Sequence, residues 1–194
     1  MEKRHRIFVA INLPEEVKKE LFLYEKKWPD LPAKWTPKDN LHITLQFLGA
    51  LTDQEVGEVC VAVKEVVEKH SSFSLNLNKI LYGPPLRQGF AGQAPKFVWA
   101  EGDKSEELAM LRDDLEMAII EKVSFVPEVR VFALHITLAR ISAWGFKTID
   151  PEERPEINEN IDLFFTVESI EVMESEMRRG GPVYTILESH NLNN

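Results

Sequence analysis

Apolar and polar residues alternate in the same five-residue pattern twice along the chain, once in each half. The sequence Leu-His-Ile-Thr-Leu occurs at residues 41–45 and again at residues 134–138. Alternation with a period of two, together with β-branched residues, predicts half-buried β-strands. Side chains two positions apart on a strand point the same way. Each copy therefore presents one imidazole beside one hydroxyl on its polar face.

Other apolar runs predict further strands, and one irregular stretch separates two of them. The longest irregular stretch in the first half is residues 82–96, whose glycines do not follow a dinucleotide-binding pattern. Strands are predicted at residues 7–13, 73–81, 97–100, 129–141 (containing the second copy), 163–172 as one long bent strand, and 183–187 after a glycine turn.

Apolar residues at helical spacing predict three amphipathic helices. The first begins at Pro14, and the second begins at the capping-box sequence Thr52-Asp53-Gln54-Glu55. The third has Leu108, Leu111, Leu115 and Ile119 on its buried side. Residues 144–160 are charged and contain prolines, so we expect a surface loop there. The polar tail from Ser189 is expected to be frayed.

These elements fall into two halves, and each half contains strands, an amphipathic helix and one copy of the repeat. No Gly- or Ser-rich linker separates the halves. We therefore expect one domain covering residues 1–194, of the α+β class. It should consist of two pseudo-symmetric lobes of antiparallel β-sheet with outer helices, and both copies should face a central cleft.

Composition and charge limit the possible partners. Of the 194 residues, 44% are hydrophobic and 28% are charged, values typical of a globular protein. The formal net charge of −9 disfavours broad, sequence-independent binding to nucleic acid, which requires a basic face. A narrow basic cleft that holds one or two phosphates remains compatible with this charge. Any RNA substrate should therefore be bound at an end or as a small fragment.

No apolar run approaches the roughly 18 residues that a membrane helix requires. The basic start of the chain leads into an apolar segment that Asn12 and Pro14 make too short for a signal peptide. We expect a cytoplasmic protein that does not bind membranes and is a monomer. Its single cysteine, Cys60, excludes an internal disulfide and is expected to be a buried structural thiol.

The repeated polar residues point to chemistry, because a fold needs only the apolar alternation twice. His42 and Thr44 in the first copy correspond to His135 and Thr137 in the second. Histidine titrates near neutral pH, so one imidazole can act as a base while the other acts as an acid. The threonine hydroxyls can hydrogen-bond the oxygens of an anion held between them. This arrangement suits phosphodiester chemistry without a metal.

Other chemistries find less support in the sequence. Two histidines could bind zinc, but neither copy has a third ligand beside it, such as a His-Glu-x-x-His or a cysteine pair. The Gly-x-Ser-x-Gly pattern of serine hydrolases is also missing from the sequence. We therefore expect neither a metal nor a cofactor.

The repeat and its surroundings resemble the two-histidine (2H) phosphoesterase superfamily. They are most similar to the RNA 2′,3′-cyclic phosphodiesterases once named 2′-5′ RNA ligases. The similarity covers nearly the whole chain and includes residues 6–14, 35–49, 130–132 and 181–184. One departure is Leu134, which stands where that family usually has a proline before the second histidine.

The resemblance implies that the protein opens a 2′,3′-cyclic phosphate at an RNA end to leave a 2′-phosphate. It also implies a reverse 2′-5′ joining of tRNA halves, no metal requirement, and substrates that are RNA ends or small nucleotides. His42 would be the proton donor to the 3′ oxygen, and His135 the base that activates water. Arg130 and Tyr184 are candidates for substrate binding.

Strict alternation places Phe47 and Arg140 on the apolar faces of their strands. For Phe47 we therefore expect core packing rather than stacking on a base. Two other functions stay open at this point. The chain could be a non-catalytic nucleotide-binding module of the same superfamily, or an exonuclease-like relative that trims RNA ends.

Overall fold

The computed structural model describes residues 3–84, 94–127 and 132–194. Its four α-helices are α1 (Glu15–Phe22), α2 (Asp53–Val67), α3 (Glu106–Ile120) and α4 (Ala143–Thr148), and two short 3₁₀ segments are η1 (Leu23–Lys27) and η2 (Lys38–Asn40). Its strands are β1 (His5–Asn12), β2 (Ala33–Trp35), β3 (His42–Leu51), β4 (Phe73–Gly83), β5 (Phe97–Gly102), β6 (His135–Ile141), β7 (Asn158–Val167), β8 (Ser169–Arg178) and β9 (Gly181–Asn191).

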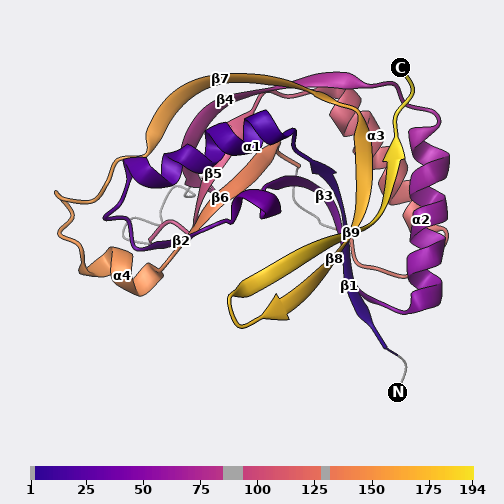
Figure 1. Cartoon of the computed structure of the whole chain (residues 1–194), viewed down its shortest axis with the longest axis horizontal. Coiled ribbons are helices and arrows are strands. Elements are labelled where there is room, and N and C mark those ends of the chain that lie inside the picture. Colours follow the sequence, from indigo (N-terminus) through magenta and orange to yellow (C-terminus); the bar gives the residue numbers. More distant parts are fainter. Residues whose placement is uncertain (1–2, 85–93, 128–131) are drawn as a thin grey trace.

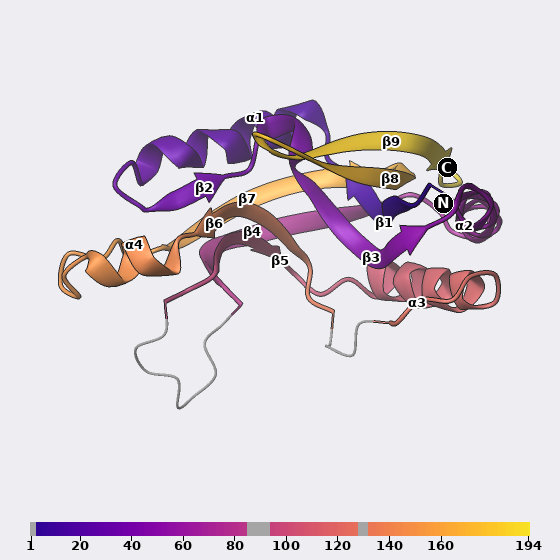
Figure 2. The same ribbon diagram turned by 90° about the horizontal axis from the view of Figure 1, so that it is seen from below.

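The strands form two separate antiparallel sheets, as the α+β prediction requires. Sheet A has the strand order β3-β1-β8-β9, and sheet B has the order β2-β6-β5-β4-β7. Figure 1 shows sheet A with α2 and α3 at one end of the molecule, and sheet B with α1 and α4 at the other. Seen from below, α2 and α3 lie beside each other at the end opposite α4 (Figure 2). Each sheet contains one copy of the repeat, in β3 and in β6.

The two repeat strands meet where the sheets join. Strand β2 pairs with β6, and the chain then runs through η2 directly into β3 of the other sheet. In this connection the Thr36 amide donates to the Leu138 carbonyl at 2.8 Å, and the Thr36 hydroxyl donates to the Thr137 carbonyl at 2.8 Å. The tip of the β8–β9 hairpin is tied to the same segment, because the Asn40 side-chain amide donates to the Pro182 carbonyl at 2.9 Å. The connection therefore fixes both repeats relative to each other.

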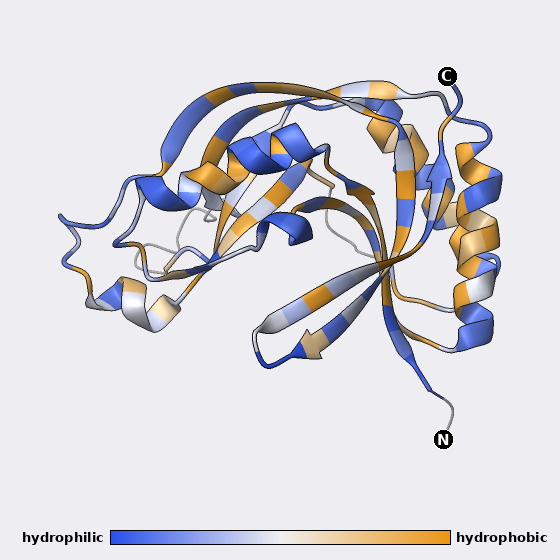
Figure 3. Ribbon diagram, viewed as in Figure 1, coloured by the Kyte–Doolittle hydropathy of each residue, from blue (hydrophilic) through white to orange (hydrophobic). Residues whose placement is uncertain are grey.

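Burial follows the alternation of the repeat. Ile43, Leu45, Ile136 and Leu138 are each at most 3% exposed and belong to one continuous core. Burying each such side chain contributes roughly 1.5–3 kcal/mol. Apolar and polar bands alternate along the strands and along α2 (Figure 3). The predicted capping box is confirmed, since the Glu55 amide donates to the Thr52 hydroxyl and the Thr52 amide donates to the Glu55 carboxylate.

Cys60 is partly buried on α2, and burial raises the pKa of its thiol to about 12. A thiol with so high a pKa is almost entirely protonated at neutral pH and is a poor nucleophile. The prediction of a structural thiol is therefore supported. In the described part of the chain, the helices are too short or too polar to cross a membrane.

The prediction of one long strand over residues 163–172 is wrong. The chain forms β7 in sheet B, passes Glu168, and continues as β8 in sheet A. Apolar residues alternate at positions 163, 165 and 167 and then at 170 and 172, so the phase of the alternation shifts at residues 168 and 169. A bend within one strand and a change of sheet produce the same shift, so the pattern does not distinguish them.

Residues 144–160 are also not wholly a loop. They include most of α4, where the Ser142 hydroxyl accepts from the Gly145 amide at 3.2 Å and Phe146 is buried. Strand β7 begins at Asn158, before the end of the predicted loop. The helix is too short for its apolar spacing to stand out against the charged residues that follow it.

The prediction of a frayed tail is wrong as well. Strand β9 continues to Asn191, and Leu192 is 5% exposed. The Asn193 amide donates to the His70 carbonyl at 2.9 Å, and the Ser72 amide donates to the Asn193 carbonyl at 2.7 Å. The tail therefore closes over the segment that follows α2.

We expect Leu192→Ala to lower the free energy of unfolding by about 2 kcal/mol, the lower end of the range for a buried leucine, because the site is close to the terminus. Urea denaturation followed by circular dichroism measures this change. Asn194→Ala, at an exposed neighbouring position, is the control and should have no effect. Equal stabilities for the two variants would mean that the tail is frayed after all.

Candidate active site

Both repeat histidines are held in the same way, by a backbone carbonyl just before the strand that each of them begins. His42 Nδ1 lies 2.7 Å from the Asn40 carbonyl oxygen, and His135 Nδ1 lies 2.8 Å from the Ala133 carbonyl oxygen. A carbonyl oxygen only accepts, so each Nδ1 carries the hydrogen. In the neutral ring Nε2 is then the unprotonated nitrogen. Each histidine therefore offers Nε2 for proton transfer.

Each imidazole also packs against an aromatic side chain from the neighbouring strand. Phe8 of β1 lies 5.1 Å from the His42 ring, and Trp99 of β5 stacks on the His135 ring at 4.0 Å with an interplanar angle of 29°. The Trp99 ring lies over Gly83, where an added Cβ would come within 2.0 Å of it. Only glycine at this position leaves room for Trp99 beside His135.

The threonines follow their histidines on the same face, as predicted, and both are partly exposed. His42 Nε2 lies 2.9 Å from the Thr44 hydroxyl oxygen. Since His42 Nδ1 carries the hydrogen, the Thr44 hydroxyl donates to Nε2 when the ring is neutral. We call the side of sheet A that carries His42 and Thr44, and the side of sheet B that carries His135 and Thr137, the motif faces.

A change of register after each threonine overturns the expectation for Phe47 and Arg140. In β3, Ala10 pairs with Thr44 and Val9 with Gln46, so Leu45 is an extra residue. In β6, Trp99 pairs with Thr137 and Val98 with Ala139, so Leu138 is an extra residue. Such β-bulges reverse the alternation beyond them.

The side chain five residues after each histidine therefore joins the motif face. Phe47 is 63% exposed and lies 6.1 Å from Phe8, so the prediction of core packing is wrong. Arg140 is exposed, with its guanidinium 4.9 Å from the Phe97 ring centroid. Strict alternation fails here because residues 45 and 46, and likewise residues 138 and 139, are consecutive buried positions.

Tyr184 reaches the motif face of sheet A from β9. Its ring lies 5.1 Å from Phe8 and 5.2 Å from His42, edge-on to both. Phe8, Phe47 and Tyr184 thus form an aromatic group beside His42. The other predicted substrate-binding residue, Arg130, lies outside the described residues.

The pKa of His42 depends on burial and on nearby positive charges, one of them on the other sheet. Burial lowers the pKa of His42 despite the opposing hydrogen bond to Asn40, and the positive charges of Lys18 and His135 lower it further. His42 and His135 belong to different sheets, but the strands that carry them, β3 and β6, lie close to each other. With a pKa below its ordinary value, His42 is neutral in the free protein at pH 7.

Lys18, Phe8 and Trp99 were not singled out in the sequence. Lys18 is on α1 and only 5% exposed. A lysine is almost never this buried without a partner. The sequence did not indicate the burial of Lys18, because most polar residues of this helix are lysine or glutamate and Lys18 does not differ from them. Phe8 and Trp99 lie on apolar strands, where nothing separates an aromatic residue beside a histidine from one in the core. Leu134, at the position of the family's proline, is buried against Gly102.

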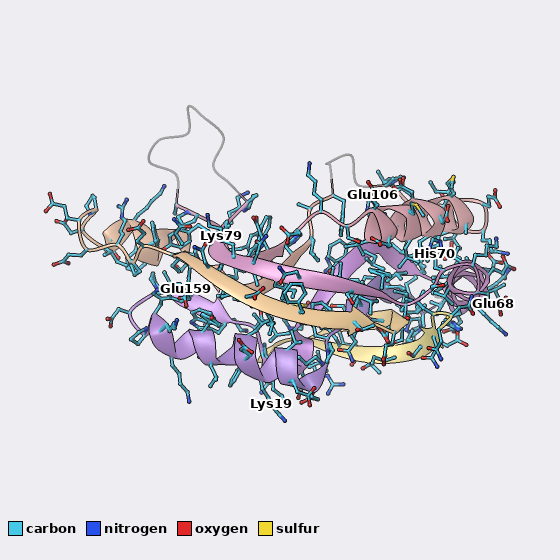
Figure 4. The ribbon with its side chains drawn as sticks, turned by 90° about the horizontal axis from the view of Figure 1, so that it is seen from above. Lys19, Glu68, His70, Lys79, Glu106 and Glu159 are labelled. Atoms are coloured by element: carbon cyan, nitrogen blue, oxygen red, sulfur yellow. The ribbon has the colours of Figure 1, made fainter. Side chains whose placement is uncertain are left out.

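Within the described ranges, no group of three or more histidine, cysteine, aspartate or glutamate side chains is arranged to hold a metal ion. His70 Nε2 lies 2.8 Å from an Asp114 carboxylate oxygen, and this contact joins the segment after α2 to α3. Figure 4 places it between these two helices.

Comparison with known proteins gives one family model and several relatives. Residues 11–90, which include the first repeat, match the model of the LigT like Phosphoesterase family. A Thermus thermophilus protein named RNA 2′,3′-cyclic phosphodiesterase is 29% identical over 194 residues, covering 96% of this chain and 90% of that protein. An Aquifex aeolicus protein of the same name is 25% identical over 182 residues, covering 90% and 86%.

Solved structures agree with this fold along its whole length. The crystal structure of a Thermus thermophilus protein superimposes with a TM-score of 0.81 at 27% identity, covering 96% of this chain and 97% of that one. Escherichia coli LigT complexed with 3′-AMP superimposes with a TM-score of 0.77, covering 99% of this chain and all of that one. At 23% identity, this second likeness concerns the fold alone.

The charge of Lys18 should be measurable in the titration of His42. We expect His42 to titrate below the ordinary histidine value of about 6.5, and Lys18→Met to move its midpoint upward, because a neighbouring positive charge that disfavours the imidazolium is removed. Histidine Cε1–H resonances followed against pH by NMR report this midpoint, with His42→Ala identifying the signal.

Lys19→Met is the matched control. Lys19 is the next residue on α1, is exposed, and lies on the outward side of the helix (Figure 4). Its removal should leave the His42 midpoint almost unchanged. An equal effect of the two substitutions would show that Lys18 has no particular proximity to His42.

Proposed function

The chain belongs to the LigT-like phosphoesterase family, and we propose that it opens the 2′,3′-cyclic phosphate at an RNA end and leaves a 2′-phosphate. The observation that carries this proposal is the pair of imidazoles from two sheets, each fixed at Nδ1 by a backbone carbonyl and each offering Nε2. A phosphodiester hydrolysis needs one base and one acid, and two such nitrogens supply both.

In the proposed reaction His135 Nε2 takes a proton from water as the water oxygen attacks the phosphorus. The bond between phosphorus and the 3′ oxygen breaks, and protonated His42 Nε2 donates its proton to that oxygen. The products are a 2′-phosphate and a free 3′ hydroxyl. His42 is neutral in the free protein, so the anionic phosphate must raise its pKa on binding, as an adjacent negative charge does. Substrate binding thus creates the acid form.

Three further side chains support the binding of a phosphate in this proposal. Thr44 and Thr137 share the motif faces with the histidines and can donate hydroxyl hydrogens to the non-bridging oxygens. Arg140 adds a charge that forms strong bonds to phosphate oxygens. The bulge after Thr137 supports this role, because it turns Arg140 onto the motif face. Arg130 remains a second candidate by resemblance.

Phe47 is the proposed contact for the terminal base. An aromatic ring that is 63% exposed, next to a catalytic histidine, offers a face on which an unpaired base can stack. Tyr184 borders the same area through its contact with His42. Phe8 packs against the rings of both residues and so holds them beside the site.

The proposal extends to several properties that the resemblance implies. The two histidines would act without a metal, since they supply the acid and the base themselves. Reverse 2′-5′ joining, with tRNA halves as substrates, would follow from the same groups acting in the opposite direction. Residues 1–194 would act as a single two-lobed domain, as a cytoplasmic monomer.

We expect His42→Ala and His135→Ala each to reduce turnover at least about a hundredfold, the usual loss on removing a general acid or base. The assay uses an RNA ending in a 2′,3′-cyclic phosphate, in EDTA, with the product isomer identified by chromatography. His70→Ala, which removes a histidine paired with Asp114 between helices, is the control. Binding without turnover by the unaltered protein would favour a non-catalytic nucleotide-binding module, and a strict need for added metal would contradict the mechanism.

The same variants assign the two roles. A substrate whose 3′ leaving atom is sulfur needs little protonation, so it should restore most of the activity of His42→Ala and leave His135→Ala impaired. Restoration of His135→Ala alone would reverse the assignment.

Thr44→Val and Thr137→Val should each slow turnover, because the activation free energy should rise by about 1–3 kcal/mol, the cost of losing a hydrogen bond to a charged group. Valine keeps the shape and the strand preference of threonine, so the melting temperature should change little. Thr166→Val, at an exposed position on β7, is the control. Early melting with normal turnover would identify the hydroxyls as structural.

A further inference from the structure

One row of side chains crosses sheet A beside the histidine site. Ile7 of β1 pairs with Glu174 of β8, so the preceding Arg6 lies in the row of Ser175, which pairs with Tyr184 of β9. On β1, Arg6 and Phe8 are two positions apart and share a face. Phe8 contacts His42 and Tyr184. Arg6 and Tyr184 therefore lie on the motif face, one row beyond Phe8.

Positive charge gathers at the Tyr184 hydroxyl from both sheets. Burial raises the pKa of Tyr184, while the charges of Arg6 from β1 and Arg140 from β6 oppose that rise. The register of β1, β8 and β9 independently places Arg6 in the same row as Tyr184. Arg6 and Arg140 are exposed, and neither has an ion-pair partner among the described residues.

The two carboxylates that flank Ser175 on β8 point to the other face. Glu174 lies 2.7 Å from His5 Nδ1, and Glu176 lies 2.7 Å from Arg178. On the motif face the same stretch presents Ser175, which is uncharged. In a chain with a net charge of −9 this is a local concentration of free positive charge. Such a place favours an anion.

We propose that Arg6 and the Tyr184 hydroxyl form a second anion subsite, which binds the phosphodiester on the 5′ side of the terminal nucleotide. The inference rests on the proposed function, which places the cyclic phosphate at His42 and His135. Arg6 is one same-face position beyond Phe8, roughly 7 Å along the strand. Because Phe8 contacts His42, the subsite borders the site of the cyclic phosphate.

The subsite defines the substrate more closely. A nucleoside 2′,3′-cyclic phosphate has no phosphodiester on its 5′ side and leaves the subsite empty. A dinucleotide or longer RNA ending in a cyclic phosphate fills it. The enzyme should therefore prefer oligonucleotide ends to mononucleotides. The β8–β9 hairpin, tied at its tip by Asn40, holds Tyr184 in place for this contact.

The test compares adenosine 2′,3′-cyclic phosphate with the dinucleotide ApA ending in the same cyclic phosphate, by kcat/KM. We expect the unaltered protein to favour the dinucleotide by about tenfold, the effect of one charge-assisted bond. Arg6→Gln should lose most of that preference, because its KM for the dinucleotide should rise. In a plot of log kcat/KM against log salt concentration, the slope for the dinucleotide should be about 0.7 less steep with Arg6→Gln than with the unaltered protein. The reason is that one phosphate contact is lost.

Arg178→Gln removes the same charge from the opposite face of sheet A, and it should behave as the unaltered protein with both substrates. Tyr184→Phe keeps the ring against Phe8 and His42 but removes the hydroxyl. It should therefore lower kcat/KM for the dinucleotide more than kcat/KM for the mononucleotide. Equal kcat/KM for the two substrates in the unaltered protein would overturn the subsite and leave the proposed function standing. Failure to open either cyclic phosphate would overturn the proposed function itself.

Discussion

The site depends on one hydrogen bond that occurs twice, from a histidine Nδ1 to the backbone carbonyl two residues before it. His42 makes it with Asn40, and His135 makes it with Ala133. It requires no additional side chain, because the acceptor is a backbone carbonyl in the segment just before each strand. It also fixes the tautomer, so that each Nε2 is left for proton transfer. The remaining features of the site support or use these two orientated rings.

Each ring is supported by a different neighbour, and this makes the two halves of the site unequal. His135 stacks on the large indole of Trp99, whereas His42 lies beside Phe8 and Tyr184 and receives a hydrogen bond from Thr44. Burial, Lys18 and His135 all act against the charged form of His42. In the proposed mechanism, a bound phosphate anion reverses that balance. The two identical repeats take different proton-transfer roles in this proposed mechanism, because their surroundings differ.

The β-bulges enlarge each repeat from two functional positions to three. Without them, Phe47 and Arg140 would point into the cores of their sheets. With them, the motif face of sheet A gains an aromatic surface and that of sheet B gains a cation. In the proposed function, these equivalent positions serve different parts of a nucleotide, Phe47 the base and Arg140 the phosphate. Bulges are known to re-aim side chains near active sites in this way.

The sequence by itself determined the two repeat strands, the three long helices and the four residues His42, Thr44, His135 and Thr137, because alternation, helical spacing and an exact repeat are local signals. The tertiary structure decided what depends on pairing between strands. It placed Phe47 and Arg140 on the motif faces, since a bulge is a property of two strands in register and not of one. It also brought Lys18, Trp99 and Arg6 to the site, and divided residues 158–178 between two sheets at Glu168. Burial and proximity arise only when distant segments meet, so no pattern along one strand could reveal them.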